Sequence, residues 1–164
     1  MEFRKFPIEF VERTKHLLES YKGDYEVSNT LNCTLGLVIL PFETNEHFLS
    51  HVSLEKLEET LDIEIRYLRS IENYRIYRSA ELLRRVRNGL SHRHIIPRSI
   101  RGNVSGIIVW DYRVSNCPDS ESYASNEQKL YEKCAEVEFE FTCEGLKRFA
   151  LFIADRYLEA SRNR

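Results

Sequence analysis

Arg87, Asn88 and His92 lie within six residues, in the segment RNGLSH. A guanidinium can hold a phosphate group and offset negative charge that builds on its oxygens. An imidazole titrates near neutral pH, so it can take up or release a proton during a reaction. An asparagine amide can orient the histidine or bond to the phosphate. A phosphate-binding group beside an acid/base group suits a site that cuts RNA.

The spacing of these residues is a weak indication by itself, because arginine is common in this chain. On an unbroken helix, five residues place Arg87 and His92 about 140° apart. A break near Gly89 would let both side chains face one groove. The non-catalytic alternative stays open: His92 would be a cation favoured at a helix C-terminus, and Arg87 would pair with an acid such as Glu81.

The charge of the chain is unevenly distributed. Residues 66–101 carry a charge of +8, with ten arginines, two glutamates and no lysine. Because the net charge of the chain is −2, the remaining residues carry −10. The arginines are at positions 66, 69, 75, 78, 84, 85, 87, 93, 98 and 101. This footprint fits a nucleic-acid partner. The alternative is a solvated helix face, or arginines paired with acids elsewhere in the fold.

The segment LRRVRNGLSHRHI resembles the ribonuclease members of the HEPN superfamily (higher eukaryotes and prokaryotes nucleotide-binding domains). In those helical bundles an arginine is followed by a polar residue, usually asparagine, and by a histidine after four to six residues. The resemblance implies a metal-independent endoribonuclease that needs no cofactor. It also implies a homodimer whose two motifs face each other. Arg87, Asn88 and His92 match the motif, with roles in transition-state electrostatics, positioning and proton transfer.

Basic residues around the motif are expected to contact RNA. They are Arg84, Arg85, Arg93, His94, Arg98 and Arg101. His94 is also a candidate second acid. Some HEPN toxins carry a modifiable tyrosine two residues after the motif histidine, and here that position is His94. Regulation by tyrosine modification at this site is therefore not expected.

The apolar pattern predicts mostly helices in a single domain, residues 1–164. Helices are expected over 7–22, from 53 to 71, over about 73–90 and over about 144–161. Residues 28–41 are ambiguous, because Ser28 and Asn29 can cap a helix and Pro41 can stop it, whereas the β-branched residues favour a strand. We predict a buried helix there.

Two segments have strand character. Residues 104–114 are rich in β-branched and aromatic residues, and residues 137–143 alternate apolar and polar side chains. They are expected to pair as antiparallel strands joined by a long polar excursion. The predicted fold is therefore mainly α, a HEPN-like helical bundle with a small antiparallel β-hairpin before the last helix. Trp110 and Tyr112 could stack on a base, although packing is the preferred interpretation.

Composition and residue spacing also argue against disulfide, metal and membrane-spanning classes of protein. The four cysteines lack zinc-site spacing, and a disulfide framework is not expected in a domain of this size. Cys33 and Cys143 are expected in the core. His47 and His51 stand four residues apart but with few carboxylates nearby, so no metal site is predicted. The longest apolar run, LGLVIL, is too short to span a bilayer, and a cytosolic location is expected.

The leading hypothesis is a HEPN-type endoribonuclease, acting on single-stranded RNA as a toxin or antiphage defence effector with an antitoxin or defence-system partner. The second is a non-catalytic HEPN module that binds nucleic acid, a nucleotide or a partner protein. The third is a plain helical dimerisation domain.

Overall fold

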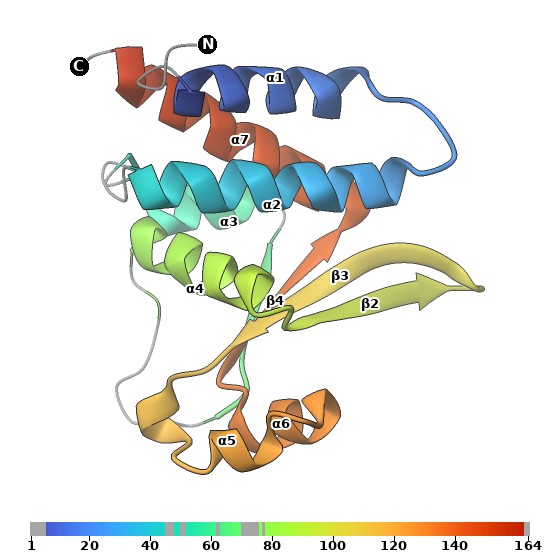
Figure 1. The fold of residues 1–164 in the computed structure, drawn as a ribbon, viewed down its shortest axis with the longest axis vertical. Helices are drawn as coiled ribbons and strands as arrows, with labels where there is room; N and C mark the ends of the chain where they lie inside the picture. The colour runs from blue at the N-terminus through green and yellow to red at the C-terminus, as the bar shows by residue number, and fades with distance from the viewer. Residues whose placement is uncertain are drawn as a thin grey trace.

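The computed structural model describes residues 6–44, 48–49, 52–61, 63–69, 76 and 78–162. Three long helices form one side of the molecule: α1 (Phe6–Ser20), α2 (Glu26–Thr44) and α7 (Cys143–Arg162). The shorter α4 (Ser79–Ser91) lies between α2 and a β-sheet (Figure 1). Apolar side chains of all four helices enter the main core, which includes Val11, Leu37, Leu82 and Phe149.

The helices predicted over 7–22 and 144–161 are confirmed by α1 and α7. The ambiguous segment 28–41 is also helical, within α2. The prediction that Pro41 stops this helix is wrong, because α2 continues to Thr44. Pro41 is buried beside Leu37 and Val38 on the inner face of the helix, and this burial offsets the cost of a proline inside a helix.

A four-stranded antiparallel sheet replaces the predicted hairpin, with strand order β1-β4-β3-β2. Its strands are β1 (Glu64–Tyr67), β2 (Ile95–Ile100), β3 (Asn103–Asp111) and β4 (Val137–Thr142). The predicted pairing of β3 with β4 is confirmed, for example where Val109 lies opposite Phe139. The edge strand β2 contains Pro97, and its register with β3 shifts between Arg98 and Ser99.

The helix predicted from 53 to 71 is wrong in its second half. A helix, α3, covers only Leu54–Leu61, and β1 begins three residues later. Ile65 lies opposite Phe139 of β4, so pairing with a distant strand overrides the helical spacing of the apolar residues. The helix predicted over 73–90 is seen as α4, which begins at Ser79; positions 73–75 and 77 lie outside the described residues.

The long polar segment between β3 and β4 is folded. It contains a 3-10 turn, η2 (Val114–Asn116), and two short helices, α5 (Ser120–Tyr123) and α6 (Glu127–Cys134), at the far end of the sheet (Figure 1). A small second core forms there around Trp110, Leu130 and a disulfide between Cys117 and Cys134. The sequence did not lead us to expect this disulfide. Its cysteines come together because both lie beside the buried Trp110.

The other two cysteines are free: Cys33 is buried as predicted, whereas Cys143 is only partly buried. The fold class is confirmed as mainly helical with a small antiparallel sheet. Within the described ranges, no helix combines the length and the apolar character needed to cross a membrane.

Candidate functional site

The motif segment lies in the last turns of α4, which pack closely on β3. Leu82, Val86 and Leu90 form the buried stripe of this helix. At Gly89 the backbones approach so closely that a Cβ atom would lie 2.5 Å from Cγ1 of Val109 and 2.6 Å from the Trp110 carbonyl oxygen. Glycine is therefore required for this packing. The break near Gly89 that would turn both side chains into one groove is not seen, because α4 continues to Ser91.

The helix ends just before His92, which is the exposed C-cap residue. Arg93 follows with a φ of 61°. Its N–H donates to the Leu90 carbonyl at 3.2 Å, and the N–H of His94 donates to the Gly89 carbonyl at 2.8 Å. These two bonds form a Schellman cap, with arginine at the position that usually holds glycine. The cap turns the chain into β2 and leaves the His92 side chain in solvent.

Asn88 lies between the arginine and the histidine of the motif in the sequence, and its side chain bonds to the arginine. Asn88 and His92 are four residues apart, so they lie about 40° apart around the helix. Arg87 would point elsewhere, but its Nη1 donates to Oδ1 of Asn88 at 2.9 Å. This hydrogen bond draws the guanidinium of Arg87 toward the face that Asn88 shares with His92. Arg87 and Asn88 are therefore joined by a hydrogen bond, while Asn88 and His92 occupy neighbouring positions on one helix face.

A buried ion cluster lies behind Asn88. Arg85 is only 4% exposed, and its Nη1 and Nη2 donate to Asp111 Oδ2 and Glu136 Oε2, both at 2.7 Å. Burial raises the pKa of the Asp111 carboxyl, while the Arg85 charge and hydrogen bonds from Arg85 and the Asn88 side chain act in the opposite direction. The expectation that Arg85 contacts RNA does not fit this position, because two carboxylates enclose its guanidinium.

His94 is buried as well. Its ring stacks on Trp110, with centroids 4.0 Å apart and planes 13° apart, and the centroid of the His92 ring lies 5.7 Å from that of the His94 ring. Desolvation, with a smaller contribution from the nearby His92 charge, lowers the pKa of His94 to about 4. His94 is therefore neutral near pH 7 rather than the imidazolium that a general acid requires, which argues against the expected second acid. Trp110 is fully buried, so packing is confirmed for it rather than base stacking.

The other predicted RNA contacts are at the surface. Arg84 and Arg93 are exposed on and just after α4. Arg98 is exposed on β2, 3.4 Å from Glu140, and Arg101 is exposed at the tip of the β2–β3 hairpin. Figure 1 shows this hairpin extending away from the end of α4. A six-residue strand is about 20 Å long. Arg101 therefore cannot contact the same phosphate as Arg87 of its own chain.

Asp111 and Glu136 were not anticipated from the sequence. Asp111 ends the apolar run IIVWD, and an acid at the end of a buried strand is a usable signal. Glu136 immediately precedes β4 and gave no comparable signal. Its hydrogen-bond partners, Arg85 and Asn116, are distant in sequence, and so is Arg113, whose Nε lies 3.9 Å from Glu136 Oε2.

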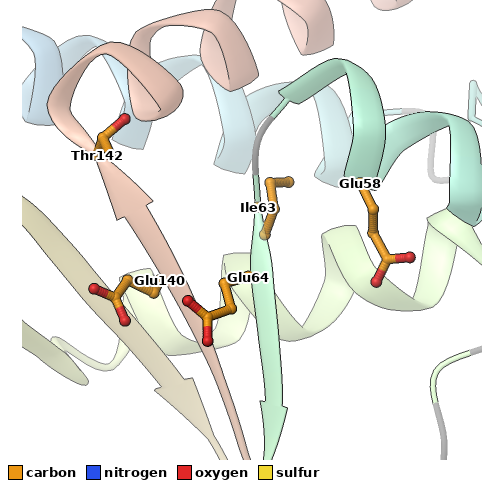
Figure 2. Close-up of a pocket in the computed structure, with 5 residues that line it drawn as sticks. All are labelled: Glu58, Ile63, Glu64, Glu140 and Thr142. Atoms are coloured by element: carbon orange, nitrogen blue, oxygen red, sulfur yellow. The ribbon is translucent and has the colours of Figure 1, made fainter.

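A separate pocket of about 400 Å³ lies at the other end of the sheet, lined by Glu58, Ile63, Glu64, Glu140 and Thr142. Figure 2 shows the carboxylates of Glu64 and Glu140 on neighbouring strands β1 and β4. None of the predicted site residues lines this pocket, and its acidic lining disfavours phosphate. Among the described residues, no cluster of three or more His, Cys, Asp or Glu side chains could hold a metal ion; His47 and His51 lie outside that part.

Comparison with known proteins gives one result. The family model described as HEPN pEK499 p136 matches residues 1–164. No curated protein and no solved structure matches the chain.

Proposed function

The chain belongs to the HEPN pEK499 p136 family, and from this premise we propose that it is a metal-independent endoribonuclease that cleaves single-stranded RNA. HEPN membership alone suggests a nucleotide-binding or ribonuclease-type module. The finer assignment depends on one observation: the hydrogen bond between Arg87 and Asn88, which draws a guanidinium toward the helix face of the exposed His92. We expect this arrangement to place a phosphate-binding cation and a proton-transfer group on the same side of the helix end.

The reaction forms a bond from the 2′-oxygen to phosphorus and breaks the bond from phosphorus to the 5′-oxygen. The 2′-hydroxyl loses a proton and the leaving 5′-oxygen gains one, so the products are a 2′,3′-cyclic phosphate and a 5′-hydroxyl. His92 transfers protons in this scheme. Arg87 stabilises the charge on the phosphate oxygens, and Asn88 holds Arg87 in place.

The reaction takes a proton from the 2′-hydroxyl and gives one to the 5′-oxygen, and this favours a site with two groups that transfer protons. His92 is exposed, whereas the neighbouring His94 is buried and neutral near pH 7 because its pKa is lowered to about 4. A second His92, from another copy of the chain, can supply the missing group. The proposal therefore includes a homodimer in which the two α4 ends share one RNA strand.

Incubation of single-stranded RNA with the protein in EDTA tests the proposal. We expect cleavage that leaves 2′,3′-cyclic phosphate ends. His92→Ala and Arg87→Ala are expected to lower the cleavage rate by about 10²- to 10⁴-fold. Matched controls are His16→Ala and Arg13→Ala, since both residues are exposed on α1. Cleavage that survives loss of His92, or that requires a divalent cation, would refute the proposal.

The second candidate is a non-catalytic HEPN module that binds nucleic acid. The exposed arginines of the β2–β3 hairpin, Arg98 and Arg101, favour this function. It predicts binding of RNA without turnover, with an affinity that falls steeply as salt rises and that drops further in Arg98→Ala and Arg101→Ala. A filter-binding series at several salt concentrations, run beside the cleavage assay, separates the two functions.

The biological role is part of the same proposal. A cytosolic ribonuclease of this kind would act as a toxin or antiphage defence effector, held inactive by an antitoxin or another defence-system partner. Growth arrest on expression of the wild-type chain, and normal growth with His92→Ala, would be the expected cellular result.

A further inference from the structure

The orientation of the Asn88 side chain is set from behind by Asp111. Asp111 forms an ion pair with Arg85 and accepts hydrogen bonds through its carboxylate oxygens, so the Asn88 side chain that bonds to it must present its NH₂ group. The amide oxygen is then directed to the other side, where it accepts from Nη1 of Arg87 at 2.9 Å. A flipped amide would place its oxygen against the carboxylate and its NH₂ group against the guanidinium, losing both hydrogen bonds.

Asp111 is itself fixed inside the protein. It is 3% exposed, lies at the end of β3 and accepts from Arg85 at 2.7 Å. The other arm of Arg85 is held by Glu136, which also accepts from Nδ2 of Asn116 at 2.6 Å. The sheet and the segment after β3 thus hold the carboxylate on a rigid base.

We propose that Asp111 is a positioning residue of the ribonuclease site, which orients Asn88 and through it the guanidinium of Arg87. This inference rests on the proposed function. Asp111 does not touch the substrate. It connects a buried ion cluster to the phosphate-binding group by two successive hydrogen bonds.

The sheet contains a similar cluster that serves as an internal control. Glu138 is 3% exposed and accepts from Nη1 of Arg66 at 3.1 Å and from the Tyr131 hydroxyl at 2.7 Å. Arg66 also pairs with Glu64 and Glu140. These partners lie on β1, β4 and α6 rather than on α4. Replacing Glu138 therefore perturbs a buried carboxylate of the same kind without touching Asn88.

The substitution Asp111→Asn keeps the shape of the side chain and removes its charge. Arg85 then retains the Glu136 carboxylate as a buried partner of opposite charge. The folded state is expected to persist. However, an amide at position 111 can present either an oxygen or an NH₂ group to Asn88, so the orientation of Asn88 is no longer enforced.

The decisive measurement is a double-mutant cycle on RNA cleavage with Asp111→Asn and Asn88→Ala. We expect each single variant to lower kcat by about ten- to a hundredfold with little change in KM. The double variant should cleave no more slowly than Asn88→Ala alone, because Asp111 acts only through Asn88. Glu138→Gln should cleave at the wild-type rate. Effects that multiply in the double variant, or an equal loss in Glu138→Gln, would overturn the inference.

A second readout does not require activity. In an NMR spectrum of ¹⁵N-labelled protein, the side-chain NH₂ signals of Asn88 can be assigned by their loss in Asn88→Ala. Asp111→Asn should shift these signals, and Glu138→Gln should leave them in place. If the wild-type protein does not cleave RNA but the signals shift, the proposed function fails while the link from Asp111 to Asn88 stands. Unshifted signals would overturn the inference whatever the activity.

Discussion

Arg85 and Arg87 stand two residues apart on α4, but they lie in different surroundings. Arg85 faces the sheet, where Asp111 and Glu136 enclose its guanidinium. Arg87 is only partly buried and donates to Asn88. Residues two apart on a helix lie about 200° apart around its axis, so Arg85 is on the packed side and Arg87 on a more open one, and the two arginines acquire different roles. On α4, the inner face supplies structure and the exposed end supplies the candidate chemistry.

The two histidines that follow repeat this contrast. His92 lies in solvent at the helix end, whereas His94 is buried between the His92 ring and the Trp110 ring, on which it stacks. A basic segment therefore cannot be treated as one surface. Its charge count indicates a partner, but the position of each residue on the helix decides which charges can reach that partner.

The largest expected difference is between Arg85 and Arg84. Arg85→Ala leaves two buried carboxylates without their guanidinium, so we expect a loss of about 3–5 kcal/mol in the free energy of unfolding. Arg84 is exposed and lies 3.9 Å from Glu81, so Arg84→Ala should change the same quantity by less than about 0.5 kcal/mol. Urea unfolding followed by circular dichroism measures both. Equal losses would contradict the division of α4 into two sides.

The next effect is the pH dependence contributed by His94. Its pKa is about 4 in the folded protein against an ordinary 6.5, so only the unfolded chain takes up this proton between those values. The contribution of neutral His94 to the stability of the folded state is fully present above about pH 6.5 and is lost as the pH drops toward 4. We expect His94 to contribute a loss of about 2 kcal/mol between pH 7 and pH 5.

His94→Phe preserves the stacking on Trp110 and removes the titration. The unfolding free energy of the wild type should therefore fall by about 2 kcal/mol relative to that of His94→Phe between pH 7 and pH 5. His16→Ala, at an exposed position on α1, should run parallel to the wild type. A wild-type curve parallel to that of His94→Phe would show that His94 titrates normally.

A smaller effect is expected at Gly89. Alanine favours helix formation over glycine by about 1 kcal/mol. Here the added methyl group would meet Val109 and the Trp110 carbonyl, and overpacking of this kind costs about 1–3 kcal/mol. We expect a net loss of about 1 kcal/mol, measured as a lower urea midpoint. A gain in stability would mean that α4 is not pressed against β3.

The smallest effect is expected at Arg93, whose φ of 61° is more easily adopted by glycine. Arg93→Gly should raise the free energy of unfolding by no more than about 1 kcal/mol. It should also weaken RNA binding, because it removes an exposed guanidinium beside His92. Thermal melting and filter binding measure the two changes. If stability drops instead, the Arg93 side chain makes a stabilising contact.

Much of the helical part could be predicted from the sequence, because a long helix displays its buried side as a regular stripe. Residues 144–161 show this clearly. β1 could not be found in the same way: Leu61, Ile65 and Leu68 have helical spacing, and only the pairing of Ile65 with Phe139 makes that stretch a strand. Residues 115–135 are polar, and their short helices depend on packing against Trp110.

The candidate site was only partly predictable for a related reason. Arg87, Asn88 and His92 are neighbours in sequence, and the motif identifies them. The partners of Arg85 are 26 and 51 residues away, so no local pattern shows that this arginine is buried. The break considered at Gly89 is absent, because α4 continues to Ser91, and Arg87 bonds to Asn88 on the unbroken helix.

The edge strand β2 has a consequence for how copies of this chain can associate. Pro97 has no N–H group to offer, and the register shift after Arg98 interrupts the regular backbone pattern. A newly arriving strand would therefore find no continuous template along this edge. At the high local concentrations reached during synthesis, this feature should suppress open-ended stacking into fibrils and leave side-chain contacts to determine assembly.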